Sequence, residues 1–217
     1  MSPLYPTSPV YRTPPAPLAT PPAAPTARPS SWIAKTTSLL WTNATVVAPD
    51  ARPQLVFIGD LTSPEDASRE STMFALPRMQ LAARAFRHLA VTKADAARDP
   101  RLVSYAPNAP VLLIMTPDAG HAFELHGTSL TATEASEKMR AVVASVSTDD
   151  LTAIVDASER TQAAITAVDE EIRGLATAIL PDADRRDRLA AAARRRDALV
   201  VEFRERFVLH PRTVARS

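Results

Sequence analysis

The spacing of apolar positions divides the chain into an N-terminal arm, a compact domain and a helical section. Residues 1–53 show no regular apolar spacing, residues 54–147 contain short apolar runs, and residues 148–209 carry apolar residues three and four positions apart. Short apolar runs between turn residues are typical of buried strands, and three- and four-residue spacing is typical of amphipathic helices. The pattern predicts an extended arm, an α/β domain of the α+β sandwich type, an antiparallel helical hairpin and a tail at residues 210–217.

Within the compact domain the pattern predicts the order strand, helix, strand, helix, strand, strand, helix. The predicted strands are the apolar runs at residues 55–58, 88–93, 111–115 and 121–125. Helices are expected after Ser63, after Asp99 and over residues 135–146, with Ser63 as the N-terminal cap of the first. Pro77 lies inside that first helix and should kink or split it, because proline has no backbone N–H.

One proline segment links this order of elements to a known family. Residues 108–110 lead directly into the apolar run that starts at Val111, and a turn follows at residues 117–120. Over residues 53–147 the chain resembles the thioredoxin-like fold, and Pro110 matches that family's cis-proline. The resemblance implies a groove for extended peptides beside Pro110.

The sequence departs from that family at its redox motif. The chain has no cysteine, and the positions of the family's two cysteines fall near Ser63 and Asp66. Neither side chain can replace a thiolate, which is the species that exchanges disulfides. The family's acid in the first strand is also absent, since Val56 and Phe57 stand there. The resemblance therefore implies a redox-inactive domain whose remaining use is binding.

Charge supports a paired, coiled-coil-like hairpin over residues 148–209. Residues 148–180 carry seven acids against two arginines, whereas residues 181–217 carry ten arginines against six acids. Opposite charges on facing helices favour their pairing. The apolar stripe of the second helix includes Leu199, Phe203 and Phe207. Each helix buries only one side in such a pair, so we expect the stripe to contact the domain, a second copy of the chain or another subunit.

The N-terminal arm contains both tryptophans of the chain. Residues 1–53 hold twelve of the twenty prolines, which predicts extended polyproline II or disordered structure. Trp32 and Trp41 would make good anchors on a partner surface, because large aromatic side chains dominate many interfaces. The alternative is that they pack on the chain's own domain. Residues 1–49 contain no acidic residue, a composition typical of organelle transit segments. We expect a cytoplasmic protein, with a mitochondrial location as the alternative.

The amino-acid composition excludes several kinds of catalytic and ligand-binding site. Four glycines are too few for the phosphate-binding loops, and the absence of cysteine removes thiolate nucleophiles and cysteine metal sites. The spacing of His121 and His126 matches no ligand pattern. Acids are interspersed among the arginines of residues 185–196, which predicts a solvated helical face rather than a nucleic-acid patch. No apolar stretch is long enough to span a membrane. The sequence thus predicts no catalytic residue, cofactor or metal, no nucleic-acid partner and no membrane insertion.

The arm, the domain and the hairpin are each suited to contacts with other proteins, and none of them carries a recognised catalytic motif. This organisation favours a non-enzymatic role. We expect a structural or accessory subunit of a larger protein assembly, which uses the arm and the hairpin to contact other protein subunits. A homo-oligomer through the hairpin remains open. The alternative is a peptide-binding or chaperone-like adaptor that uses the groove beside Pro110. The predicted partner-binding residues are Trp32, Trp41, Pro110, Leu199, Phe203 and Phe207.

Overall fold

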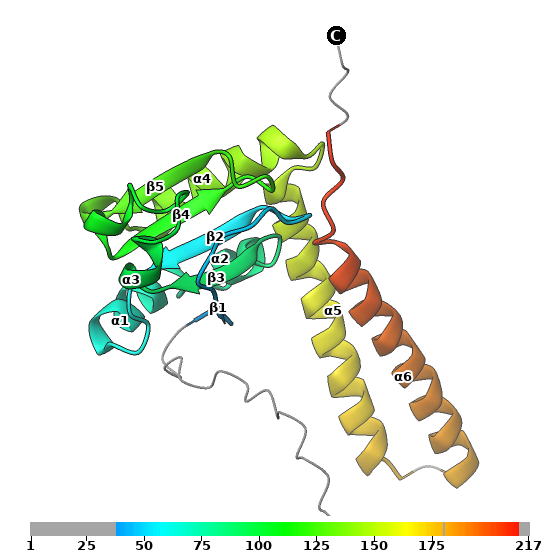
Figure 1. Cartoon of the computed structure of the whole chain (residues 1–217). Coiled ribbons are helices and arrows are strands. Elements are labelled where there is room, and N and C mark those ends of the chain that lie inside the picture. Colours follow the sequence, from blue (N-terminus) through cyan, green and yellow to red (C-terminus); the bar gives the residue numbers. More distant parts are fainter. Residues whose placement is uncertain (1–37, 180, 213–217) are drawn as a thin grey trace, which may run out of the picture.

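A mixed five-stranded sheet forms the centre of the α/β domain (Figure 1). The computed structural model describes residues 38–179 and 181–212. The strand order is β1-β3-β2-β4-β5. The strands are β1 (Thr42–Asn43), β2 (Gln54–Ile58), β3 (Arg87–Val91), β4 (Val111–Met115) and β5 (Ala122–His126). β1, β3 and β2 run parallel to one another, while β4 runs antiparallel to both β2 and β5. Four of these strands lie where the apolar runs predict them.

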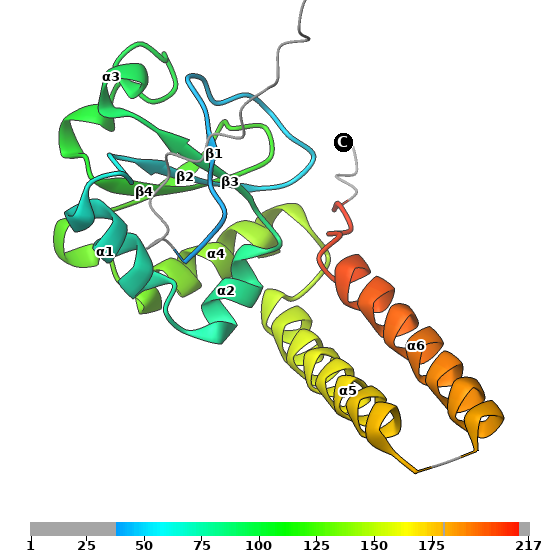
Figure 2. The ribbon, with the colours of Figure 1, turned by 90° about the horizontal axis from the view of Figure 1, so that it is seen from below.

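Helices cover one face of the sheet, and loops with one short helix cover the other (Figure 2). The helices are α1 (Pro64–Met73), α2 (Pro77–Ala83), α3 (Lys93–Ala96), α4 (Ala132–Val146), α5 (Leu151–Thr177) and α6 (Asp182–Glu205), with 3-10 turns at Ala106–Asn108 and Gly127–Ser129. Leu55 and Phe57 face the core under α1, α2 and α4, whereas Val56 and Ile58 face the core under α3. Successive side chains of β2 therefore fill two separate cores, which explains why all its positions are buried.

Pro77 splits the first predicted helix, as expected. α1 ends at Met73, and Pro77 is the first residue of α2, where its missing N–H costs no helical hydrogen bond. Ser63 caps α1, since its Oγ accepts a hydrogen bond from the Asp66 N–H at 3.2 Å.

The helix predicted after Asp99 is wrong. The short helix lies earlier, at Lys93–Ala96, where the Thr92 side chain caps it, and turns follow Asp99. The Asp99 carboxylate is used elsewhere: it accepts hydrogen bonds from the N–H of Arg101 at 2.9 Å and of Val47 at 2.7 Å. The second of these bonds joins it to a segment far away in the sequence.

Residues 38–53, which the apolar pattern assigns to the arm, pack on the domain. β1 pairs with β3 at the edge of the sheet, and Leu39, Trp41 and Val47 are buried. The folded part therefore extends to Ser38 at least. We call residues 38–41 the strap, because they cross α1 before entering β1.

Glu70 holds the strap against α1. Its carboxylate is fully buried, with 0% of the residue exposed. Oε2 accepts a hydrogen bond from the Ser38 N–H at 2.6 Å, and Oε1 accepts from the Leu39 N–H at 3.1 Å and the Trp41 indole N–H at 3.0 Å. Burial raises the pKa of Glu70, and these three donors offset only part of that rise.

The substitution Glu70→Gln tests this attachment. The glutamine amide would place donors against backbone N–H donors, so we expect a loss of about 1–3 kcal/mol of unfolding free energy. In a Trp32→Phe background, Trp41 is the sole tryptophan, and its emission should move to longer wavelength as the strap loosens. Urea unfolding and fluorescence measure both effects. Glu65→Gln, on the exposed side of the same helix, is the control and should cost less than about 0.5 kcal/mol. Equal behaviour of the two variants would contradict the role given to Glu70.

Candidate binding surfaces

A groove of about 440 Å³ lies beside Pro110. Its walls come from three segments: the residues after β2, the residues after β3 and the residues before β4. The lining residues are Gly59, Asp60, Asp66, Thr92, Lys93, Ala94, Ala109 and Pro110. The peptide bond between Ala109 and Pro110 is cis, as the resemblance implied. The groove thus opens at the carboxyl ends of two parallel strands, a common place for binding sites in α/β sheets.

The carboxylates of this groove are engaged in local structure. Asp66 Oδ2 accepts a hydrogen bond from the Asp60 N–H at 2.8 Å. Asp60 in turn accepts from the Thr62 hydroxyl and the Thr62 N–H, and these bonds lower the pKa of Asp60. A side chain at Gly59 would collide with Asp66 Oδ2, which lies 2.8 Å from the position of a Cβ. These contacts fix the turn between β2 and α1, so the carboxylates are already occupied as acceptors.

Lys93 supplies the cationic side chain of the groove. Among the described residues it makes no ion pair, and it stands at the start of α3 beside the cis bond. Ser63 and Asp66 form the cap and first turn of α1. The arrangement offers an open wall and one cation, which suits the binding of an extended chain.

The structure decides between the two alternatives for Trp41. Its ring packs on the chain's own domain, with ring centroids 6.0 Å from Phe57, 6.3 Å from Phe74 and 5.6 Å from His88. Because this side chain is buried, it is not displayed to a partner in this conformation. Trp32 lies outside the described residues.

The two long C-terminal helices pack together as a hairpin that projects from the domain (Figures 1 and 2). α5 packs on α2 and α4, while α6 packs mainly on α5. Ion pairs join the two helices, from Arg195 to Glu171 at 2.6 Å and from Arg196 to Asp169 at 2.6 Å. The expected pairing of an acidic with a basic helix is therefore confirmed at these positions.

Two of the three predicted hairpin residues contact the domain. Phe207 is buried, and Phe203 is half-buried with its ring centroid 5.4 Å from that of Phe207. Both belong to the core on the helical face of the sheet. Leu199 is half-buried one turn further along α6. Phe203 and Phe207 thus anchor the hairpin to its own domain.

The rest of α6 is largely open to solvent. Ala192 is its sole fully buried residue. Large apolar side chains are exposed at Ile179, in the turn between the helices, and at Val201 on α6. Part of the hairpin surface is therefore apolar and uncovered by the described part of the chain.

Hydrogen bonds between residues 146–149 and residues 210–212, which we call the polar clasp, close the base of the hairpin. Asp149 Oδ2 accepts hydrogen bonds from the His210 N–H at 2.6 Å and the Ser147 hydroxyl at 2.8 Å. The Thr148 N–H donates to the His210 carbonyl at 3.1 Å, and the Arg212 N–H donates to the Val146 carbonyl at 3.0 Å. Residues 210–212 of the predicted tail are therefore attached to the start of α5. Burial alone would raise the pKa of Asp149, but the bonds from His210 and Ser147 together lower it.

Within residues 38–179 and 181–212, no group of three or more metal-ligating side chains lies close enough to hold an ion. None of the helices in these ranges is both long and apolar enough to cross a bilayer. In comparisons with known proteins, no family model, no curated protein and no solved structure matches this chain.

The substitution Asp149→Asn should weaken the clasp in a pH-dependent way. Because the folded-state pKa of Asp149 lies below its ordinary value of 3.8, its ionised form stabilises the folded chain above that pH. This stabilisation is lost as the pH falls through the folded-state pKa. We expect the variant to lose about 1 kcal/mol at neutral pH and less in acid. Urea unfolding over a pH series measures the difference. Asp187→Asn, at an exposed position of α6, should show neither effect; a pH-independent loss at Asp149 would refute this account.

Proposed function

We propose that this chain is a non-catalytic accessory subunit that docks to other proteins through its projecting hairpin. The carrying observation is that α6 has a single fully buried residue, Ala192, although the helix runs from Asp182 to Glu205. A helix with so little burial gains little stability from its own chain. A partner that covers its apolar positions would supply the missing contacts.

The body that carries the hairpin is, in this proposal, a redox-inactive thioredoxin-like domain. The mixed sheet, the order of strands and helices, and the cis bond before Pro110 support the resemblance. Ser63 and Asp66 stand where that family has its cysteines. The Ser63 side chain caps α1, and the Asp66 carboxylate holds the turn before the helix by accepting from the Asp60 N–H. The domain is thus a scaffold rather than a redox centre.

The hairpin is suited to docking because its two helices are held in one register. The pairs Arg195–Glu171 and Arg196–Asp169 join the two helices at adjacent positions, although exposure to solvent limits how much each pair stabilises the hairpin. Near its base, Arg78 on α2 pairs with both Asp156 and Glu159 on α5. A surface fixed in this way presents its exposed apolar side chains in a defined arrangement, which reduces the entropy lost on binding.

A second candidate is an adaptor that binds extended peptide in the groove beside Pro110. The observation that favours it is the open groove of about 440 Å³, with Lys93 at its wall. Lys93 makes no ion pair with any residue that the structure describes. Such an adaptor would be a stable monomer with weak, transient ligands. Lys93→Glu would impair it without affecting the hairpin.

Val201→Glu tests the leading proposal, with Val103→Glu as the matched control. The two valines are similarly exposed, at 53% and 50%, but Val103 lies on the domain. Tagged full-length chain is purified gently from its own cells, and the mass and composition of the product are determined. We expect an assembly of fixed stoichiometry that Val201→Glu disrupts, because a buried unpaired carboxylate is costly at an interface.

The outcomes separate the two candidates. Loss of the assembly with Val201→Glu and its retention with Val103→Glu would support docking through the hairpin. A monomer from every variant would refute the accessory-subunit proposal. A stable assembly that only Lys93→Glu disrupts would contradict docking through the hairpin and would assign the contact to the groove beside Pro110.

A further inference from the structure

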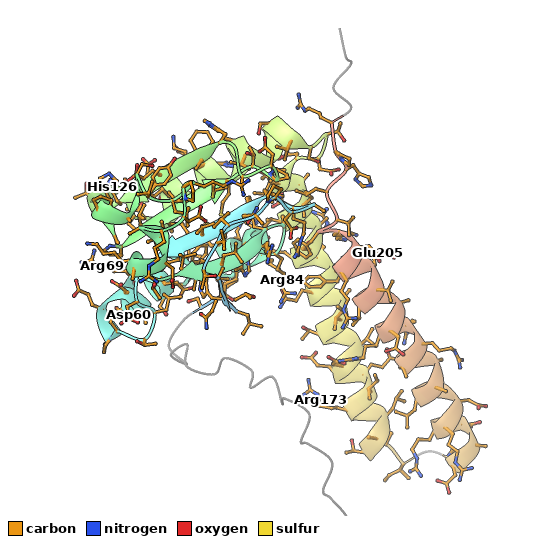
Figure 3. All side chains as sticks on the ribbon, viewed as in Figure 1. Asp60, Arg69, Arg84, His126, Arg173 and Glu205 are labelled. Carbon is orange, nitrogen blue, oxygen red and sulfur yellow. The ribbon has the colours of Figure 1, made fainter. Side chains whose placement is uncertain are left out.

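A second and larger cleft, of about 630 Å³, lies where the hairpin joins the domain. Four arginines line it, from three parts of the chain: Arg52 before β2, Arg84 after α2 with Arg87 at the start of β3, and Arg204 near the end of α6. Figure 3 shows Arg84 at this junction. We call it the arginine cleft.

Most of this positive charge is uncompensated. Asp50 pairs with Arg87 at 3.1 Å and approaches Arg52 at 3.9 Å. Arg84 and Arg204 make no ion pair within the described part of the chain, and the Arg84 guanidinium lies over the Phe203 ring, 5.1 Å from its centroid. Like charges gathered in a concave site concentrate the electric field and attract anions.

His88, on the wall of the cleft, experiences the same field. Its Nε2 lies 2.8 Å from the Ala83 carbonyl oxygen. Burial lowers the pKa of His88 most strongly, and the charges of Arg52 and Arg84 lower it further. The smaller part of this shift, due to the two arginine charges, is consistent with the positive field of the cleft.

The rim of the cleft is apolar as well as cationic. Leu40 is 93% exposed and Val208 is 64% exposed, and both line the cleft. A small inorganic anion would satisfy the arginines and leave these side chains in water. A peptide segment with both carboxylates and apolar side chains would cover both kinds of surface.

The N-terminal part of the chain outside the described residues has the wrong charge to fill the cleft. Residues 1–37 contain Arg12, Arg28 and Lys35 and no acidic residue. This segment therefore supplies no carboxylate that could complement the four arginines. Charge complementarity therefore favours an occupant from another protein.

We propose that the arginine cleft binds an acidic, extended segment of a partner protein. Its carboxylates contact Arg84 and Arg204, and its apolar side chains cover Leu40 and Val208. The inference rests on the proposed function, because it specifies the chemistry of a partner that docks at the base of the hairpin. The arginine cleft would be a second contact with the partner, separate from the hairpin contact at Val201.

A direct binding titration tests the cleft. The probe is a short peptide of alternating glutamate and leucine with a neutral dye, titrated with full-length chain and followed by fluorescence anisotropy. The same peptide with glutamine in place of glutamate is the control ligand. We expect the acidic peptide to bind more tightly and to lose affinity as salt is added, because salt screens the arginines.

Two double variants with the same change in net charge locate the site. Arg84→Glu with Arg204→Glu should weaken binding about tenfold or more, since two attractive contacts become repulsive. Arg186→Glu with Arg188→Glu, at exposed positions near the start of α6 and away from the cleft, should change it by less than about twofold. Circular dichroism during urea unfolding checks that both variants fold.

Several results would overturn the inference: equal binding of the acidic and glutamine peptides, equal effects of the two double variants, or displacement of the peptide by inorganic phosphate at matched ionic strength. Wild-type chain and the Arg84→Glu, Arg204→Glu chain are also purified from cells, as in the test of the proposed function. The two experiments together tell failure of the cleft assignment apart from failure of the accessory role. If wild-type chain forms an assembly but binds no acidic peptide, the cleft assignment fails and the accessory role stands. If the peptide binds at the cleft and no assembly forms, the cleft assignment stands and the accessory role fails.

Discussion

The buried carboxylate of Glu70, which makes no ion pair within the described residues, is the constraint on which much of this structure depends. Burial of such a group is tolerated when hydrogen bonds replace its water, and three donors from the strap do so here. The same contacts bring Trp41 into the core and Leu40 to the rim of the arginine cleft. Glu70 therefore contributes both to the packing of the domain and, through the position of Leu40, to the shape of the arginine cleft.

The hairpin depends on the domain in a different way, through its base. Phe203 and Phe207 enter the core, Arg78 pairs with two acids of α5, and Asp149 closes the connection to residues 210–212. Beyond these contacts the two helices depend on each other. The protein thus combines a well-packed α/β domain with an extension whose outer surface lacks internal partners within the described residues.

The local pattern of apolar residues predicted most of the strands and helices of the domain, but little of the candidate binding surfaces. The runs at Val56 and Leu113 are buried on both faces, so their apolar character alone marks strands, and Pro77 marks the break between α1 and α2. The strap was assigned to the arm because its burial depends on Glu70, far away in sequence. Glu70 carried one usable signal, since it lies three residues from both Ala67 and Met73 on the buried side of α1. The arginine cleft gave none, because it assembles residues from separate segments.

The length of the hairpin sets a geometry for whatever binds it. α5 contains 27 residues, which at about 1.5 Å per residue gives a rod of roughly 40 Å. Ion pairs at its base and the packing of Phe203 and Phe207 in the core join this rod to the domain. A molecule held near Ile179, at the far end, and another held at the domain would be separated by a set distance. The hairpin would then set the spacing between the two bound molecules.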